Sequence, residues 1–148
     1  MNPGEVAEIL ASLVRLDMDA IRIYEQAILA VDMVAIRDRF AQFRYDHQRH
    51  VDELNTTIRN LGFEPPAQQP ENTSLTPGLS MVLAQGGTES ALEVMHANER
   101  LISRRYTQVS TMKLPLGILT LVGNNCRDEQ RHFQYVEQTL AIRTWEKR

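Results

Sequence analysis

Apolar residues recur every three or four positions along four stretches of this chain, a spacing that matches one face of an α-helix. The first stretch opens with the residues NPGE, which are typical of a helix start with Asn as the cap and Pro in the first turn. No stretch shows the strict alternation expected of a β-strand. The sequence therefore predicts an all-α fold, a four-helix bundle in one domain spanning 1–148. Its predicted helices cover about 3–31, 33–61, 88–112 and 116–145.

The connections between these helices differ greatly in length. The join near Asp32 is so short that the first two helices must be antiparallel neighbours, with Asp32 as a candidate cap and Gly62 as a stop. Residues 62–87 are rich in Pro, Gln, Gly and Ser and indicate a connection, inside which a short helix is expected to start at Thr76-Pro77 and to run through Leu83. At about 3.3 Å per residue, this connection can run the length of a bundle of roughly 43 Å. It allows a crossover that makes the second and third helices parallel.

The two halves of the chain repeat one another without gaps. The pentapeptide DHQRH at 46–50 returns as DEQRH at 128–132, an offset of 82 residues. The chain thus resembles a duplicated helical hairpin, in which each copy carries an acid on its first helix and a polar-x-x-His pair on its second. The offset pairs the following positions of the apolar seams: Asp17 with Glu99, Tyr24 with Tyr106, His47 with Glu129 and His50 with His132.

Six ionisable residues of the seams are expected to meet at the middle of the bundle. Asp17 and His47 each lie 15 residues from Asp32, and Glu99 and Glu129 lie at similar distances from Pro115. Burying unpaired charges costs several kcal/mol each, which a pair of divalent ions would offset. Carboxylates and imidazoles are ligands that iron and manganese accept. The candidate metal ligands are Asp17, His47, His50, Glu99, Glu129 and His132.

Other readings of the same polar positions remain open. A hydrogen-bonded network of acids and histidines without metal is one. Tyr24 and Tyr106 are expected to be core tyrosines with a hydrogen bond, Cys126 a small core residue, and His96 a surface residue or a neighbour of the ligands. Four further repeated residues are expected to form salt bridges on the bundle flanks or to orient the ligands: Asp46, Arg49, Asp128 and Arg131.

Composition narrows the possible partners. The net charge is −3 and no basic stripe is visible, which argues against nucleic acid. The longest apolar stretch, 114–122, is less than half a membrane span, and the N-terminus shows no secretory signal. The single cysteine excludes an internal disulfide and a Cys-based zinc site. A cytoplasmic protein without membrane contact is expected.

The whole arrangement resembles the ferritin-like superfamily, which includes ferritins, rubrerythrins and the radical subunit of ribonucleotide reductase. That family has an acid on helices 1 and 3 and Glu-x-x-His on helices 2 and 4. The phrases DMDAIRIYEQAI, HVDELNTTIRNLGFEPP and NNCRDEQRHFQYVEQ are also similar to small bacterial ferritin-like proteins of unassigned function, some of them thought to be stress-related. The resemblance implies terminal ligands at Asp17 and Glu99, a bridging Glu129, and one metal at each of His50 and His132.

This chain departs from the family pattern at two positions. Asp17 is shorter than the usual Glu, and His47 replaces a Glu that usually bridges the two metals. The change at His47 implies a weaker second ion, a single ion, or a metal other than iron, with Asp46 as a substitute ligand after a small helix rotation.

The resemblance implies binding of one or two iron or manganese ions, with oxidation of ferrous iron or reaction with dioxygen or peroxide. The alternative is a metal-free helical stress-response or scaffolding dimer with a decayed site, and storage of iron in a cage is a third and weaker reading. Residues 116–122 are apolar nearly all round and should be buried either against 75–85 or against a second subunit. A homodimer is the expected assembly.

Overall fold

The start of the first helix follows directly from its sequence. In the computed structural model, which describes residues 1–68, 83–84 and 86–146, helix α1 covers Pro3–Ala30. The Asn2 side chain accepts a hydrogen bond of 2.8 Å from the backbone N–H of Glu5, and Pro3 occupies the first turn, where a missing N–H costs nothing. The predicted start of this helix is confirmed.

The second helix, α2 (Val34–Asn60), begins differently from the prediction. Its cap position is Met33, which makes no side-chain hydrogen bond, so the expected cap role of Asp32 is wrong. The backbone N–H of Asp32 instead donates to the Thr88 hydroxyl at 3.1 Å, which ties the hairpin turn to the start of the third helix. At its far end, Gly62 has a φ of 93°, a left-handed conformation that glycine adopts readily, and the predicted stop is confirmed.

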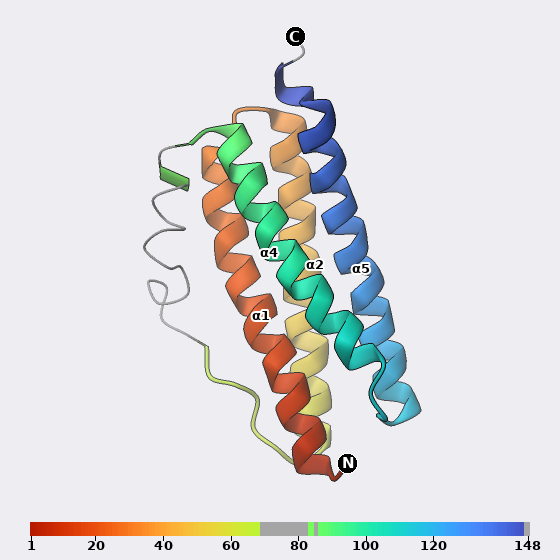
Figure 1. Cartoon of the computed structure of the whole chain (residues 1–148). Coiled ribbons are helices and arrows are strands. Elements are labelled where there is room, and N and C mark those ends of the chain that lie inside the picture. The colour runs from red at the N-terminus through yellow and green to blue at the C-terminus, as the bar shows by residue number, and fades with distance from the viewer. Residues whose placement is uncertain (69–82, 85, 147–148) are drawn as a thin grey trace.

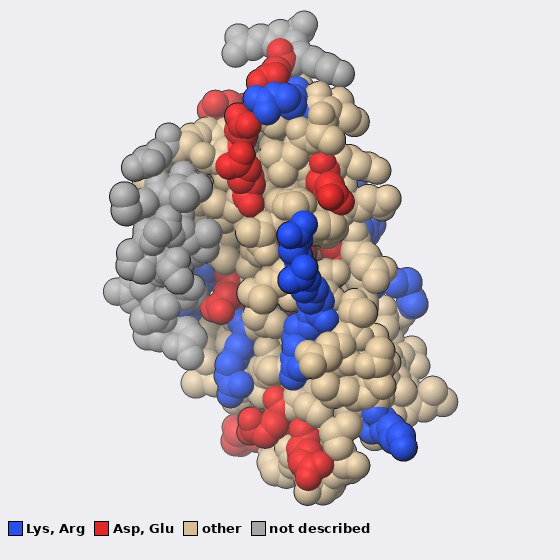
Figure 2. Space-filling model, in the orientation of Figure 1, with Lys and Arg blue, Asp and Glu red and all other residues tan. Residues whose placement is uncertain are grey.

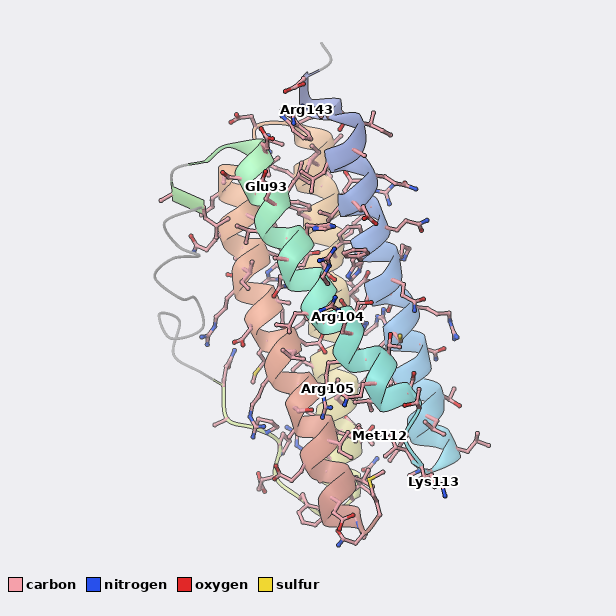
Figure 3. The ribbon with its side chains drawn as sticks, viewed as in Figure 1. Glu93, Arg104, Arg105, Met112, Lys113 and Arg143 are labelled. Atoms are coloured by element: carbon pink, nitrogen blue, oxygen red, sulfur yellow. The ribbon has the colours of Figure 1, made fainter. Side chains whose placement is uncertain are left out.

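The second pair of helices is α4 (Thr88–Ser110) and α5 (Leu116–Ile142), followed by a short 3₁₀ turn, Thr144–Glu146. Helix α5 ends three residues earlier than predicted because Arg143 takes a left-handed φ of 56°. Arg143, labelled in Figure 3, lies where this end of α5 meets the start of α4. Its guanidinium donates to both Glu89 oxygens, at 2.9 and 3.2 Å, and also pairs with Glu146.

The four long helices form a bundle of two hairpins, which confirms the predicted all-α fold (Figure 1). Helices α1 and α2 pack closely on each other, as do α4 and α5, and α1 also packs against α4. Figure 1 shows α2 and α4 running in the same direction, so the connection between them is a crossover. The contact between α2 and α5 is much sparser, which matters for the polar groups that lie on that side.

Two apolar clusters fill the bundle, one toward each end. One includes Leu10, Leu54 and Val109, and the other includes Phe40 and Leu92. On α2, α4 and α5 the predicted metal ligands lie between the residues of one cluster and those of the other, whereas Asp17 on α1 is flanked by Val14 and Ala20 of the first cluster. A buried polar layer therefore lies across the middle of an otherwise apolar core.

The predicted short helix over 77–83 falls mostly outside the described residues. Of that segment, Leu83 is helical and buried in the cluster that contains Phe40 and Leu92. The apolar stretch 116–122 is only partly covered: Ile118 and Val122 are buried in the opposite cluster, whereas Leu116 is 80% exposed. The prediction that 116–122 is buried against 75–85 is not supported at Leu83, because Leu83 lies in the other apolar cluster.

The surface carries charges of both signs. On the face shown in Figure 2, blue Lys and Arg side chains lie over the middle and red Asp and Glu side chains gather toward the two ends. Arg105, labelled in Figure 3, reaches from α4 to the Ser12 hydroxyl on α1 at 3.0 Å. Within the described part of the chain, no helix is both long enough and apolar enough to cross a membrane.

Candidate metal centre

All six predicted ligands meet in the polar layer, and none of them has any exposed surface. One residue comes from α1, two from α2, one from α4 and two from α5. Their donor atoms form two groups, each of which lies within 4.8 Å and has the composition of a metal site. The first group is Asp17, His47, His50 and Glu129, and the second is His47, Glu99, Glu129 and His132. The predicted convergence of these side chains is confirmed.

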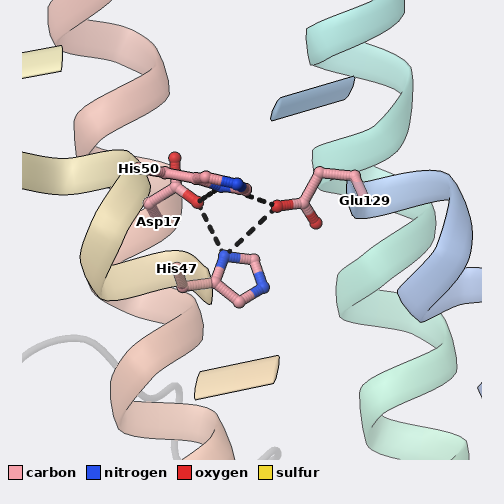
Figure 4. Close-up of side chains that lie close together, drawn as sticks. All are labelled: Asp17, His47, His50 and Glu129. Atoms are coloured by element: carbon pink, nitrogen blue, oxygen red, sulfur yellow. Dashed lines mark hydrogen bonds and ion pairs between the residues drawn. The ribbon is translucent and has the colours of Figure 1, made fainter. Parts of the chain in front are cut away.

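The first group brings side chains of α1, α2 and α5 into direct contact (Figure 4). Asp17 Oδ1 lies 2.6 Å from His47 Nδ1 and 3.2 Å from His50 Nδ1. Glu129 Oε1 lies 3.3 Å from His47 Nδ1 and 3.2 Å from His50 Nδ1. Ligand atoms about 2.1 Å from one ion would be separated by roughly 3.0–3.4 Å, so this spacing is close to that of a coordination shell.

The second group lies on the other side of the His47 ring. His47 Nε2 is 3.0 Å from Glu99 Oε1. His132 Nδ1 is 3.5 Å from Glu99 Oε2 and 3.7 Å from Glu129 Oε2. This group is looser than the first, and the two groups share His47 and Glu129.

A tyrosine from the opposite hairpin fixes each of the two acids on α1 and α4. The Tyr24 hydroxyl donates to Glu99 Oε1 at 2.6 Å, and the Tyr106 hydroxyl donates to Asp17 Oδ2 at 2.5 Å. Burial raises the pKa of both phenols well above the usual value, and the neighbouring carboxylates raise it further. Both tyrosines are thus core residues with a hydrogen bond, as predicted.

The repeated Asp and Arg residues connect the histidines to the surface where α2 faces α5. His50 Nε2 lies 2.9 Å from Asp128 Oδ2, which also accepts a hydrogen bond of 2.6 Å from Arg49. In the symmetric arrangement, His132 Nε2 lies 2.8 Å from Asp46 Oδ2, which accepts a hydrogen bond of 2.8 Å from Arg131. Both expected roles apply, because these residues form salt bridges across the flank and orient the histidines.

These carboxylates stay ionised. Burial by itself would raise the pKa of Asp46, but hydrogen bonds from His132 and Arg131 outweigh it and lower the pKa to about 2. Asp46 also lines a surface hollow of about 500 Å³ together with Tyr45 and Arg131. Only the Asp46 side chain, which contacts His132 Nε2, therefore separates this hollow from His132.

The inner acids differ sharply from one another. Burial raises the pKa of Glu129 well above its usual value, and Glu99 raises it further. For Glu99 itself, burial opposes ionisation, but the charge of His47 and the hydrogen-bonding contacts with His132, His47 and Glu129 together outweigh it and hold the pKa well below the usual value. His47 shows the complementary effect: burial lowers its pKa, but Glu99 and Asp17 together raise it to about 10. With no metal bound, the imidazolium of His47 therefore stands between the carboxylates of Asp17 and Glu99.

Several buried polar atoms of the centre lack a hydrogen bond to any described residue. They are Glu99 Oε2, both carboxylate oxygens of Glu129, and His132 Nδ1. Buried polar atoms are nearly always paired, since an unpaired one costs about 1–3 kcal/mol. All four atoms belong to the second group or to the residue that the two groups share. This unmet demand, and the mixture of carboxylate and imidazole donors, fit a divalent cation.

The sequence interpretation missed one asymmetry between the two halves. Phe43 packs on the His132 ring with 4.2 Å between ring centres. The offset of 82 places Asn125 at the equivalent position of the second half. Asn125 is fully buried, and neither polar atom of its amide has a partner among the described residues. The break in the repeat at this pair of positions was the signal that could have identified it.

His96 and Cys126, which the sequence did not predict to be ligands, lie outside the centre. The His96 side chain is 24% exposed, stacks on Phe133 at 4.8 Å and lies 3.9 Å from Glu137. Cys126 is buried in the apolar cluster that contains Leu10 and Leu54. Neither belongs to the two ligand groups.

The fold and the centre define an all-helical bundle with buried acid and histidine clusters that can hold a metal ion. A family model described as "Domain of unknown function (DUF2383)" matches residues 5–111, and the chain belongs to this family. The matched range contains four of the six residues of the centre but ends before α5, which supplies Glu129 and His132. The search of curated proteins returned no match.

Proposed function

We propose that this protein is a ferritin-like metal-binding protein that holds one or two iron or manganese ions in the buried centre. The observation that carries the proposal is the set of four buried donor atoms at Glu99, Glu129 and His132 that make no hydrogen bond and lie 3.2–3.7 Å from one another or from a neighbouring histidine. Burying three acids and three histidines in the middle of an apolar core costs free energy unless another interaction compensates for it. Iron and manganese accept this mixed set of oxygen and nitrogen donors.

In this proposal Asp17 and Glu99 are terminal ligands, His50 and His132 each hold one ion, and Glu129 lies between the ions. His47 is a ligand whose role differs from that of the family's glutamate. When bound, such ions would supply the electrons that reduce dioxygen or peroxide and would themselves be oxidised, which makes a ferroxidase or peroxidase-like activity the proposed chemistry.

The protein's own residues prepare the ligand atoms. Asp128 accepts the Nε2–H of His50 and Asp46 accepts that of His132, which leaves both Nδ1 atoms facing the centre. Tyr24 and Tyr106 each hold one oxygen of an acid and so fix the direction of the other oxygen. The apolar clusters on both sides keep bulk water out of the layer.

A second candidate is a metal-free helical dimer that acts in a stress response or as a scaffold. The observation that favours it is the position of His47, whose ring lies 2.6 Å from Asp17 and 3.0 Å from Glu99. A protonated His47 offsets part of the negative charge that a metal would otherwise neutralise. It leaves the oxygens of Glu129 without a hydrogen bond, however, and we therefore prefer the metal-binding function.

Equilibrium dialysis against Mn²⁺, or against Fe²⁺ without oxygen, tests the proposal. The wild type should retain one or two ions per chain, and Glu129→Ala should lose at least one because both ligand groups contain Glu129. Glu137→Ala is a matched control, since Glu137 lies two turns further along α5 and is exposed. Unchanged metal content in Glu129→Ala, with folding verified by circular dichroism, contradicts the assignment.

The proposed assembly is a homodimer in the cytoplasm, with the exposed Leu116 as part of its apolar contact surface. Light scattering separates a dimer from a cage of many subunits, because their masses differ greatly. A monomeric mass would remove the scaffolding dimer as an alternative and leave the metal site to be judged by its metal content.

A further inference from the structure

His47 is the one side chain of the described centre that directs two different donor atoms toward two different acids of α1 and α4. Its Nδ1 lies 2.6 Å from Asp17 Oδ1, and its Nε2 lies 3.0 Å from Glu99 Oε1. In Figure 4 the second ring nitrogen points away from Asp17, His50 and Glu129, which surround the first. The ring thus stands between the two ligand groups.

The repeat gives this position a counterpart. The offset of 82 pairs His47 with Glu129, and these are the two residues that both ligand groups contain. Glu129 directs Oε1 toward His50 and Oε2 toward His132, as His47 directs Nδ1 and Nε2. The two shared residues are therefore equivalent by the internal symmetry, one a carboxylate and the other an imidazole.

We propose that His47 bridges two metal ions, with Nδ1 bound to the ion at Asp17 and His50 and Nε2 bound to the ion at Glu99 and His132. This inference rests on the proposed metal-binding function. A ring nitrogen that binds a metal carries no proton, so two bound ions displace both N–H protons, which leave to solvent, and the bridge is an imidazolate. No electron is transferred in this step.

Such a bridge sets the distance between the ions. The two lone pairs of an imidazole point away from each other in the ring plane, so with metal–nitrogen bonds of about 2.0–2.1 Å the ions stand about 6 Å apart. Two-metal sites bridged by carboxylates or oxygen atoms hold their ions about 3.5–4 Å apart. At about 6 Å, a single solvent oxygen with bonds of about 2.1 Å cannot reach both ions. His47 in place of a glutamate would then keep the two ions from sharing one oxygen atom.

The competing arrangement is a His47 that binds a single ion through Nδ1 and keeps its Nε2 proton for Glu99. Both arrangements use the same side-chain positions, but only a bridge couples the electrons of the two ions through the ring. Cu²⁺ is a suitable probe because it has one unpaired electron and high affinity for imidazole.

The test is electron paramagnetic resonance of the full-length protein during titration with Cu²⁺, with bound copper measured in parallel. In the wild type, the first equivalent should give one spin per chain, and the second should reduce the integrated low-temperature signal toward zero instead of raising it to two spins. His47→Gln should abolish this loss, because a neutral amide binds a metal ion through its oxygen alone and so does not join two ions. His96→Gln, a change at a histidine outside both ligand groups, should behave as the wild type.

The outcomes separate the bridge from the metal site itself. Two bound ions with two uncoupled spins in the wild type overturn the bridge and leave the proposed function standing, and so does saturation at one ion. Coupling that persists in His47→Gln assigns it to Glu129 and also overturns the bridge. Absence of any bound copper, iron or manganese overturns the proposed function. If His47→Gln fails to fold, the Cu–Cu distance in the wild type, obtained from the dipolar splitting of the triplet spectrum, decides: about 6 Å supports the His47 bridge and about 3.5–4 Å overturns it.

Discussion

Asp128→Asn tests whether the carboxylates between α2 and α5 act on metal affinity through the histidines. Asp128 lies 2.9 Å from His50 Nε2 and accepts a hydrogen bond of 2.6 Å from Arg49. Asparagine keeps the shape and an oxygen acceptor but removes the negative charge that makes His50 a stronger donor at Nδ1. The structure therefore predicts a weaker ion at His50 without rearrangement of the helices.

The expected magnitude follows from the type of contact. Loss of a carboxylate partner of a metal-bound histidine typically lowers affinity by about 10–100-fold, or about 1.4–2.7 kcal/mol. Folding stability should change by less than about 1 kcal/mol, because the salt bridge with Arg49 is partly exposed and exposed ion pairs contribute little. Affinity and stability should thus respond very differently to the same substitution.

Competition with a chromophoric chelator measures the stepwise Mn²⁺ constants of each variant. One constant should fall in Asp128→Asn, and Asp46→Asn should weaken the other position through His132. Asp52→Asn is the control, since Asp52 is exposed and accepts a hydrogen bond from Gln48 on the same helix. If both constants of Asp128→Asn stay within twofold of the wild type, the idea that this carboxylate acts through His50 is refuted.

Two further predictions concern the hydrogen bond of Tyr106 and the protonation of His47. Tyr106→Phe removes the hydroxyl that donates to Asp17 at 2.5 Å, and urea unfolding should show a loss of about 1.5–3 kcal/mol, the usual worth of a hydrogen bond to a charged group; Tyr45→Phe, at an exposed position, should change little, and an equal loss in both variants would contradict the role of this bond. The second prediction is a dependence on pH. The pKa of His47 is raised from 6.5 to about 10 against the effect of burial, so its contribution to stability is complete below pH 6.5 and is lost as the pH rises through about 10. Metal affinity should change in the opposite sense and rise with pH, because bound ions displace protons from His47 and Glu129. Urea midpoints and Mn²⁺ titrations between pH 6.5 and 9.5 check both trends, and a flat profile in each would show that His47 is not protonated in the folded protein.

The centre was predictable from the sequence to the extent that it depends on helix periodicity and on the repeat. The spacing of Asp17, His47, Glu99 and Glu129 from their hairpin turns fixes their height in the bundle, and this holds for either relative direction of the two hairpins. That is why the convergence of the six side chains could be predicted before the direction of α4 was known.

Contacts between the hairpins could not be predicted in the same way. The sequence placed Tyr24 and Tyr106 in the core, but which acid each one holds depends on how α1 packs against α4. The interaction of Asp128 with His50 joins α5 to α2. The spacing of apolar residues along each helix does not tell how closely these two helices approach each other. The predicted end of α5 was wrong because no glycine marks the observed end. Arg143 takes the left-handed conformation there, and its contact with Glu89 supports it.

The most direct test of the account is the location of the metal itself. Crystals of the full-length protein grown with Mn²⁺ and without chelator should show anomalous scattering peaks inside the polar layer, one beside Asp17 and His50 and, with two ions bound, another beside Glu99 and His132. A polar layer without a peak in crystals that hold Mn²⁺ elsewhere, with the six side chains bonded only to one another, would contradict the proposed metal centre.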